Sequence, residues 1–125
     1  MKIAIFNRIL EEKDLPLLRL IVKLLEEKDI KIIFYKPFYD QIDARVQINR
    51  PIETFENTDQ LTETDFLISI GGDGTILTAV TFIKNTNIPI LGINTGRLGF
   101  LANVSRTEVE QNLLVLSNEI IKLLK

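Results

Sequence analysis

The chain has 125 residues, of which 46% are hydrophobic and 26% charged, and these values are typical of one globular domain. Its formal net charge of −2 argues against nucleic acid as a partner, because domains that bind nucleic acids are usually basic. Cysteine and histidine are both absent, which excludes disulfides, thiolate metal sites, histidine bases and Ser-His-Asp triads. Any acid–base chemistry therefore falls to Asp, Glu, Lys or Tyr.

The N-terminal residues become polar too soon for a signal peptide. No apolar run approaches the roughly 20 residues that a membrane-spanning helix needs. We therefore expect a cytoplasmic protein with no membrane partner.

The first part of the chain predicts a strand, a helix and a second strand. Residues 3–6 form a short apolar strand at the N-terminus. Apolar residues then recur at helical spacing over residues 14–28, where Asp14 suits the N-cap and Pro16 the first turn. Residues 30–35 are rich in β-branched and aromatic side chains and predict the second strand.

The middle of the chain is less regular. Apolar side chains spaced between residues 38 and 50 indicate a second helix. Residues 52–55 are either a short strand or an extended connection. The polar stretch 57–64 separates this part from the next strand and holds at most one helical turn.

The last third again alternates strands and helices. Residues 66–70 are the most continuous apolar run and predict a third strand. A helix is expected over residues 75–85 and a fourth strand over residues 89–93. Ser105 and Glu108 have the spacing of a capping box, which opens a final helix.

Strands that alternate with helices at this spacing predict βαβ units. Such units give a parallel sheet with right-handed crossovers. The predicted fold is therefore α/β: an open, mostly parallel sheet with helices on both faces, in a three-layer arrangement of the Rossmann or flavodoxin type.

The segment Gly71-Gly72-Asp73-Gly74-Thr75 joins the third predicted strand to the helix behind it. Its place at the carboxyl end of a strand is where α/β sheets bind ligands. Glycine-rich backbone presents N–H groups, and a helix start adds partial positive charge, so both favour a phosphate. A carboxylate there would repel phosphates unless it held a metal ion or accepted a proton, so Asp73 indicates catalysis.

The same turn also has a structural interpretation, in which Asp73 caps the helix through its side-chain oxygen. The segment has neither the lysine of a Walker loop nor the spacing of a GxGxxG fingerprint. The turn by itself leaves both interpretations open.

A second glycine-bearing loop accompanies the fourth predicted strand. It reads Gly92-Ile93-Asn94-Thr95-Gly96-Arg97-Leu98-Gly99-Phe100-Leu101-Ala102. Together, the two loops resemble the N-terminal domain of NAD kinases, and the resemblance extends over almost the whole chain. The first motif is shared with 6-phosphofructokinases, diacylglycerol kinases and sphingosine kinases, whereas the second is much more specific.

The resemblance implies transfer of the γ-phosphoryl group of ATP, or of polyphosphate, to the 2′-hydroxyl of the adenosine ribose of NAD, which makes NADP. In that family the motif aspartate is assigned as the proton acceptor, and this catalytic role carries over to Asp73. The implied NAD- or nucleotide-binding residues are Gly71, Gly72, Asp73, Gly74, Thr75, Leu77, Arg97 and Phe100.

These residues have different expected parts in the site. Leu77 and Phe100 match positions that line the adenine side of the pocket, and Gly74 would let the dinucleotide approach the backbone. Thr75 is expected to cap the helix in preference to contacting a phosphate. Arg97 either meets a phosphate or is solvated.

The resemblance also implies Mg²⁺ as the divalent cation that accompanies ATP, bound mostly through water and phosphate oxygens. No protein metal cage is expected, so no residue is assigned as a metal ligand. NAD and ATP or polyphosphate are the expected partners, and the full-length protein is expected to be a homo-oligomer.

Members of the family continue into a β-rich second domain that supplies further NAD contacts, whereas this sequence stops at Lys125. We therefore expect residues 1–125 to be the N-terminal α/β domain, without the C-terminal one, and to be inactive alone. Two alternatives stand beside this interpretation. One is a lipid or sugar kinase domain with the same glycine turn, and the other is a non-catalytic binding or assembly module.

Overall fold

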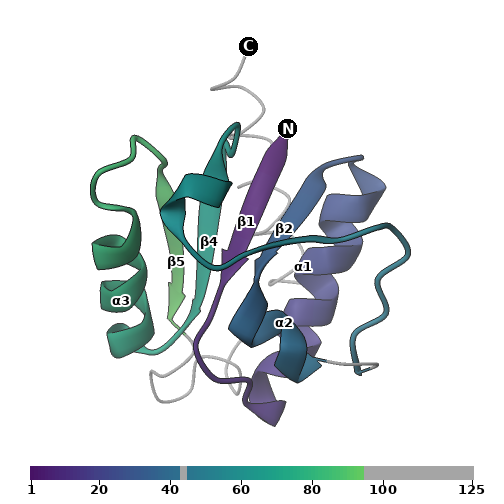
Figure 1. Cartoon of the computed structure of the whole chain (residues 1–125). Helices are drawn as coiled ribbons and strands as arrows, with labels where there is room; N and C mark the ends of the chain where they lie inside the picture. Colours follow the sequence, from purple (N-terminus) through teal and green to yellow (C-terminus); the bar gives the residue numbers. More distant parts are fainter. Residues whose placement is uncertain (43–44, 95–125) are drawn as a thin grey trace.

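The computed structural model describes residues 1–42 and 45–94 of the chain (Figure 1). Its strands form one sheet of five parallel strands in the order β3-β2-β1-β4-β5. The strands are β1 (Lys2–Phe6), β2 (Lys31–Tyr35), β3 (Glu53–Phe55), β4 (Phe66–Gly71) and β5 (Ile90–Asn94). The predicted α/β class with a parallel sheet is confirmed.

Three α-helices connect these strands, together with short 3₁₀ turns. The helices are α1 (Leu15–Glu27), α2 (Lys36–Ile42) and α3 (Asp73–Ile83), and the turns are η1 (Glu12–Asp14) and η3 (Thr58–Leu61). Within the described ranges, no helix has the length and apolar character needed to cross a membrane. The final helix predicted to open at Ser105 lies outside the described residues.

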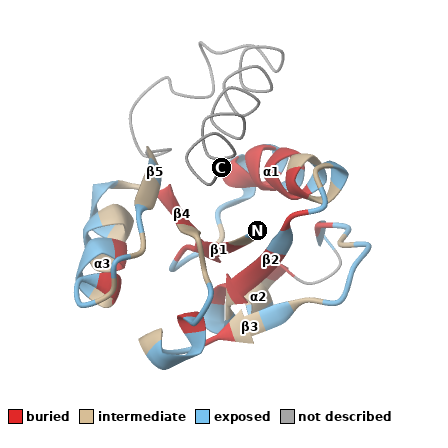
Figure 2. Cartoon of the chain, turned by 90° about the horizontal axis from the view of Figure 1, so that it is seen from above, coloured by how far each residue is buried: buried red, intermediate tan, exposed pale blue. Residues whose placement is uncertain are grey.

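The core has two parts, one on each face of the sheet. On one face, α1 and α2 pack against alternate strand residues that include Ile3, Ile5 and Ile68. On the other face, α3 and η3 cover the residues between them, such as Ala4 and Leu67. Figure 2 shows α1 and α3 on opposite sides of the sheet. Successive strand residues therefore point to opposite faces of the sheet, and both faces are buried, as is typical of parallel sheets.

Most predicted boundaries lie within one or two residues of the observed ones. Asp14 is the N-cap of α1 and Pro16 lies in its first turn, as predicted. The open question at residues 52–55 is settled by β3, an edge strand that pairs with β2. The second helix is shorter than predicted, because α2 ends at Ile42.

The long connection from β3 to β4 crosses the face of the sheet that carries α3, and it holds only the single turn η3. Four aromatic rings fill the space beneath it, with centroids 4.7 to 6.0 Å apart. They belong to Phe6, Tyr35, Phe55 and Phe82. Large aromatic side chains thus provide the packing that a helix would otherwise give to this part of the sheet.

Ser69 is a buried polar residue inside the sheet. It lies in β4, level with Phe6 and Gly92, and is 0% exposed. Its hydroxyl has no hydrogen-bond partner in the described part of the chain. Because an unpaired buried hydroxyl is destabilising, Ser69→Ala should raise the free energy of unfolding by about 1 kcal/mol in urea titrations.

The matched control is Leu67→Ala, two residues earlier on the same face of the same strand. It removes buried apolar volume and should cost about 2–5 kcal/mol. A clear loss of stability in Ser69→Ala would mean that the hydroxyl has a partner after all.

Candidate functional site

The order of the strands identifies one crevice at the carboxyl edge of the sheet. β1 leads through α1 to β2 on one side, whereas β4 leads through α3 to β5 on the other side. The direction of winding therefore reverses between β1 and β4, which are direct neighbours. Open α/β sheets bind ligands outside the carboxyl ends of the strands at such a switch point. In Figure 1 this edge is the lower end of the sheet, where α3 begins.

Gly71 turns the backbone from β4 toward α3. Its φ of +153° lies in a region that side chains disfavour. A Cβ built on this residue would also lie 2.9 Å from the Cβ and Oγ1 atoms of Thr75, which is closer than real contacts allow. Both the backbone conformation and the contact with Thr75 therefore require glycine at this position.

Helix α3 begins directly after this turn. Gly72 is the N-cap, in an extended conformation, and the Ile76 N–H donates the first helical hydrogen bond to the Gly72 carbonyl at 3.1 Å. The N–H groups before Ile76 therefore have no acceptor within the helix, and the helix dipole is positive at this end. This arrangement suits an anion such as a phosphate.

The start of α3 corrects two predictions made for this turn. The helix begins at Asp73, two residues before the predicted start, so Thr75 lies inside it and does not cap it. Asp73 is not the N-cap residue either, because Gly72 occupies that position. The N-cap residue makes no side-chain capping bond because glycine has no side chain. Asp73 is exposed in the first turn.

Two further predicted residues lie along the outside of α3. A Cβ on Gly74 would meet no atom of the described residues within 4 Å, so on their side the backbone there is open to an approaching ligand. Leu77, one turn later, is 66% exposed although it is apolar. With Thr78, Thr81 and Phe82 it lines a shallow hollow on the helix. An exposed apolar surface beside this glycine turn is suited to a flat apolar ring.

Strand β5 brings the second glycine-bearing loop to the same edge. Asn94, its last residue, lies beside Gly71 in the register of the sheet. Gly92 allows α3 to approach, because a Cβ there would lie 3.3 Å from the Ile76 side chain. The remaining predicted residues of this loop, Arg97 and Phe100, lie outside the described residues, so their parts in the site stay predictions.

The loop after β1 was not among the predicted parts of the site. Asn7 is only 2% exposed, and its Oδ1 accepts a hydrogen bond from the Arg8 N–H at 2.7 Å. This loop borders the switch point because β1 pairs with β4. The only signal in the sequence is a polar Asn-Arg pair directly after a buried strand, and it gains meaning only once the strand order is known.

The opposite, amino edge of the sheet has a groove with Lys31, Arg50 and Ile52 in its lining. Ion pairs engage part of its charge: Glu53 contacts Lys2 at 2.9 Å, and Arg50 contacts Asp29. The hydrogen bond and charge of Lys2 lower the pKa of Glu53 from its ordinary value of 4.5. The carboxyl edge, with its exposed glycine turn, is therefore the better candidate for a binding site.

The turn at Gly71 gives a direct test of this geometry. Gly71→Ala should lower the free energy of unfolding by about 2–3 kcal/mol in urea titrations, because it adds backbone strain and a clash with Thr75. Gly74→Ala is the matched control. Its Cβ meets no neighbour, and alanine favours a helix, so stability should rise by about 0.5–1 kcal/mol. Equal effects of the two substitutions would contradict the geometry described here.

Comparison with known proteins shows the family of the chain. A family model described as the ATP-NAD kinase N-terminal domain matches residues 3–120. The crystal structure of yeast NADH kinase complexed with NADH superposes with a TM-score of 0.71 at 25% sequence identity. That superposition covers 95% of this chain and 35% of the yeast chain.

Curated relatives of the chain are named NAD kinase. The NAD kinase of Cytophaga hutchinsonii is 39% identical over 108 residues, which are 86% of this chain and 37% of the relative. The NAD kinase of Bacteroides fragilis is 39% identical over 113 residues, 90% of this chain and 39% of the relative. The chain thus spans less than half the length of these relatives. With its parallel sheet, its glycine turn at the switch point and a family match over most of its length, the chain belongs to the NAD kinase family, within the N-terminal domain.

Proposed function

We propose that this chain supplies the nucleotide-binding part of an NAD kinase. The reaction would transfer the γ-phosphoryl group of ATP, or the terminal phosphoryl group of polyphosphate, to the 2′-hydroxyl of the adenosine ribose of NAD. The observation that carries the proposal is the exposed carboxylate of Asp73 in the first turn of α3, beside a glycine turn at the switch point. The name of the relatives, NAD kinase, supports NAD as the acceptor, and the family description, ATP-NAD kinase, supports ATP as the donor.

Phosphoryl transfer asks mainly for positioning and for stabilisation of charge on the phosphate. The backbone N–H groups and the helix dipole at the start of α3 would supply part of that stabilisation. In the transfer, the 2′-oxygen forms a bond to the γ-phosphorus while the bond from that phosphorus to the bridging β,γ-oxygen breaks, and ADP leaves. Asp73 would accept the proton that the 2′-hydroxyl loses.

Leu77 and Gly74 would help to bind the adenosine of NAD. The exposed side chain of Leu77 and the open backbone at Gly74 leave a surface along which the adenosine of NAD fits. Burial of that apolar surface by an adenine ring would contribute to binding. In the proposal, Phe100 lies against the same adenine, as the resemblance implies.

The Mg²⁺ that accompanies ATP would be part of the nucleotide substrate. In the part of the chain that the structure describes, no three acidic side chains come together as a possible metal cage. These residues do not form a protein site for the ion, so we derive no step through it. Phosphate oxygens and water would supply its ligands.

The first prediction from this proposal concerns Asp73 in a chimera that joins this chain to the C-terminal part of the Cytophaga hutchinsonii NAD kinase. Asp73→Asn keeps the shape of the side chain and removes the proton acceptor. We expect kcat for NADP formation to fall by about 10²-fold or more, the usual scale for a positioned base. Binding of NAD should suffer much less.

The matched control is Asp59→Asn, which removes an exposed carboxylate from η3, away from the carboxyl edge. That variant should keep the turnover of the unmodified chimera. Near-normal turnover in Asp73→Asn would contradict the role of this carboxylate as the base.

The second prediction concerns residues 1–125 without any added domain. The buried faces of the sheet should give a cooperative thermal transition, because a core exists on both sides. NADP formation from ATP, magnesium and NAD should be unmeasurable. The loops of one sheet edge form only one wall of a pocket, and misplacement by about 1 Å can cost about 10²-fold in rate.

Circular dichroism and an enzyme-coupled assay for NADP would test both parts of this prediction. Turnover within about tenfold of the Cytophaga hutchinsonii enzyme would show that no second wall is needed. A gradual, non-cooperative melt would show that this part of the fold does not stand alone.

A further inference from the structure

The loop that follows β1 lies opposite the glycine turn across the switch point. In the register of the sheet, Phe6 of β1 is level with Ser69 of β4. Asn7 and Arg8 come next, just as β4 reaches Gly71. A ligand held at the start of α3 therefore has this loop as its nearest neighbour on the β1 side.

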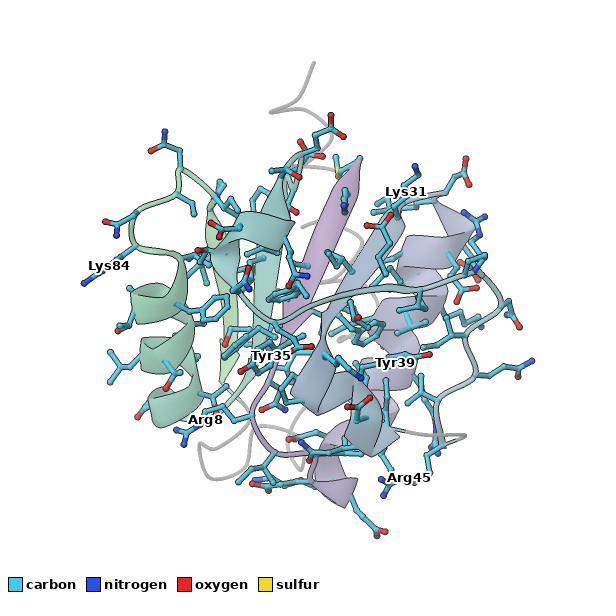
Figure 3. All side chains as sticks on the ribbon, viewed as in Figure 1. Arg8, Lys31, Tyr35, Tyr39, Arg45 and Lys84 are labelled. Atoms are coloured by element: carbon cyan, nitrogen blue, oxygen red, sulfur yellow. The ribbon has the colours of Figure 1, made fainter. Side chains whose placement is uncertain are left out.

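Arg8 presents an available cation at this edge. It is exposed, and its guanidinium makes no ion pair or hydrogen bond with the residues that the structure describes. In Figure 3 its side chain extends from the end of β1 toward the side where α3 begins. Other cations, such as Lys36 and Arg50, are already paired with carboxylates. An unpaired guanidinium beside a phosphate-binding turn suits further phosphate oxygens.

One side chain of α2 fixes the backbone that carries Arg8. The Gln41 Oε1 accepts a hydrogen bond from the Leu10 N–H at 2.8 Å, and its Nε2 donates to the Arg8 carbonyl at 3.0 Å. The same Nε2 donates to the Pro37 carbonyl at 2.9 Å, which anchors the amide to its own helix. A loop held at two points by one amide keeps Arg8 at a defined place on the edge.

Asn7 adds an independent observation. Its side chain is almost fully buried, yet its Nδ2 has no hydrogen-bond partner in the described residues. A buried amide without a partner is costly, so such groups normally have a water or ligand acceptor. The carboxyl end of β1 therefore carries an unused donor as well as an unused cation.

We propose that residues 7–10 form the β1 side of the phosphate site at this edge, with Arg8 binding the phosphate chain of the phosphoryl donor. Gln41 is the positioning residue that holds this loop. The inference rests on the proposed function for its substrate, a nucleoside triphosphate or polyphosphate. The chemistry recognised is the shared one, a chain of linked phosphate groups.

The binding part is tested on the chain itself, with tripolyphosphate as the probe, by isothermal titration calorimetry at low salt. Arg8→Gln should weaken binding about tenfold, which is the scale of a lost charge-assisted hydrogen bond. Arg8→Lys should fall between this variant and the original chain because it keeps the charge but loses the planar fork. Lys84→Gln, at the far end of α3, should change the affinity less than about twofold, because salt screens distant charges.

The outcomes of this titration are decisive either way. Equal losses in Arg8→Gln and Lys84→Gln would mean that only net charge matters, and would overturn the proposal. Absence of tripolyphosphate binding to the original chain would overturn it as well. Because Arg8 is exposed, its variants should keep the thermal midpoint of the original chain, so a loss of binding cannot be assigned to unfolding.

The positioning part is tested in the Cytophaga hutchinsonii chimera. Gln41→Met keeps the size of the side chain and removes its three hydrogen bonds. It should raise KM for ATP several-fold and leave KM for NAD unchanged. The double variant with Arg8→Gln should be no worse than Arg8→Gln alone, because the two residues act through one contact.

A rise in both KM values, or losses that multiply in the double variant, would show that Gln41 has only a general structural effect. The two levels of inference fail separately. If the unmodified chimera binds tripolyphosphate but makes no NADP, the proposed function fails and the phosphate-binding loop stands. If the unmodified chimera makes NADP and Arg8→Gln leaves KM for ATP unchanged, the proposed function stands and the inference about the loop fails.

Discussion

Between Gly71 and Thr75 the backbone passes from β4 into α3 with no room for a side chain on Gly71, and this contact controls the whole carboxyl edge. It lets the helix begin at Asp73, with Gly72 as its N-cap. Any larger residue would push Thr75 away and rotate the first turn of the helix. The positions of the Asp73 carboxylate, the free end of the helix dipole and the open backbone at Gly74 all depend on this one close approach.

The two edges of the sheet differ in how their charges are used. At the amino edge, carboxylates and cations neutralise one another, as the Lys2–Glu53 pair does. At the carboxyl edge, the exposed Arg8 guanidinium pairs with no carboxylate of the described residues. In the proposed function, ion pairs stabilise the amino edge and the carboxyl edge binds anions. A parallel sheet allows this division because all carboxyl ends meet on one side.

The sequence allowed the fold class, four of the strands and the glycine turn to be predicted, because buried parallel strands are continuous apolar runs and α1 has one apolar stripe. Local sequence patterns did not predict features that depend on contacts between residues far apart in the sequence or on the conformation of a single glycine. The start of α3 was placed too late, since the extended conformation of Gly72 leaves no mark in the sequence. The loop at Asn7 and Arg8 was missed because the neighbour of β1 is known only from the strand order. The roles predicted for Arg97 and Phe100 remain predictions, since both lie outside the described residues.

The central claim is that nucleotides bind at the carboxyl edge, between the end of β1 and the start of α3. Backbone amide NMR of the ¹⁵N-labelled chain, titrated with NAD and separately with tripolyphosphate, tests this claim most directly. We expect the shift changes to concentrate at Asn7 to Leu10 and at Gly71 to Leu77. Tripolyphosphate should affect Asn7 to Leu10 and the glycine turn, and the changes caused by NAD should extend to Leu77. Shift changes centred on Lys31, Arg50 and Ile52 at the amino edge would contradict it.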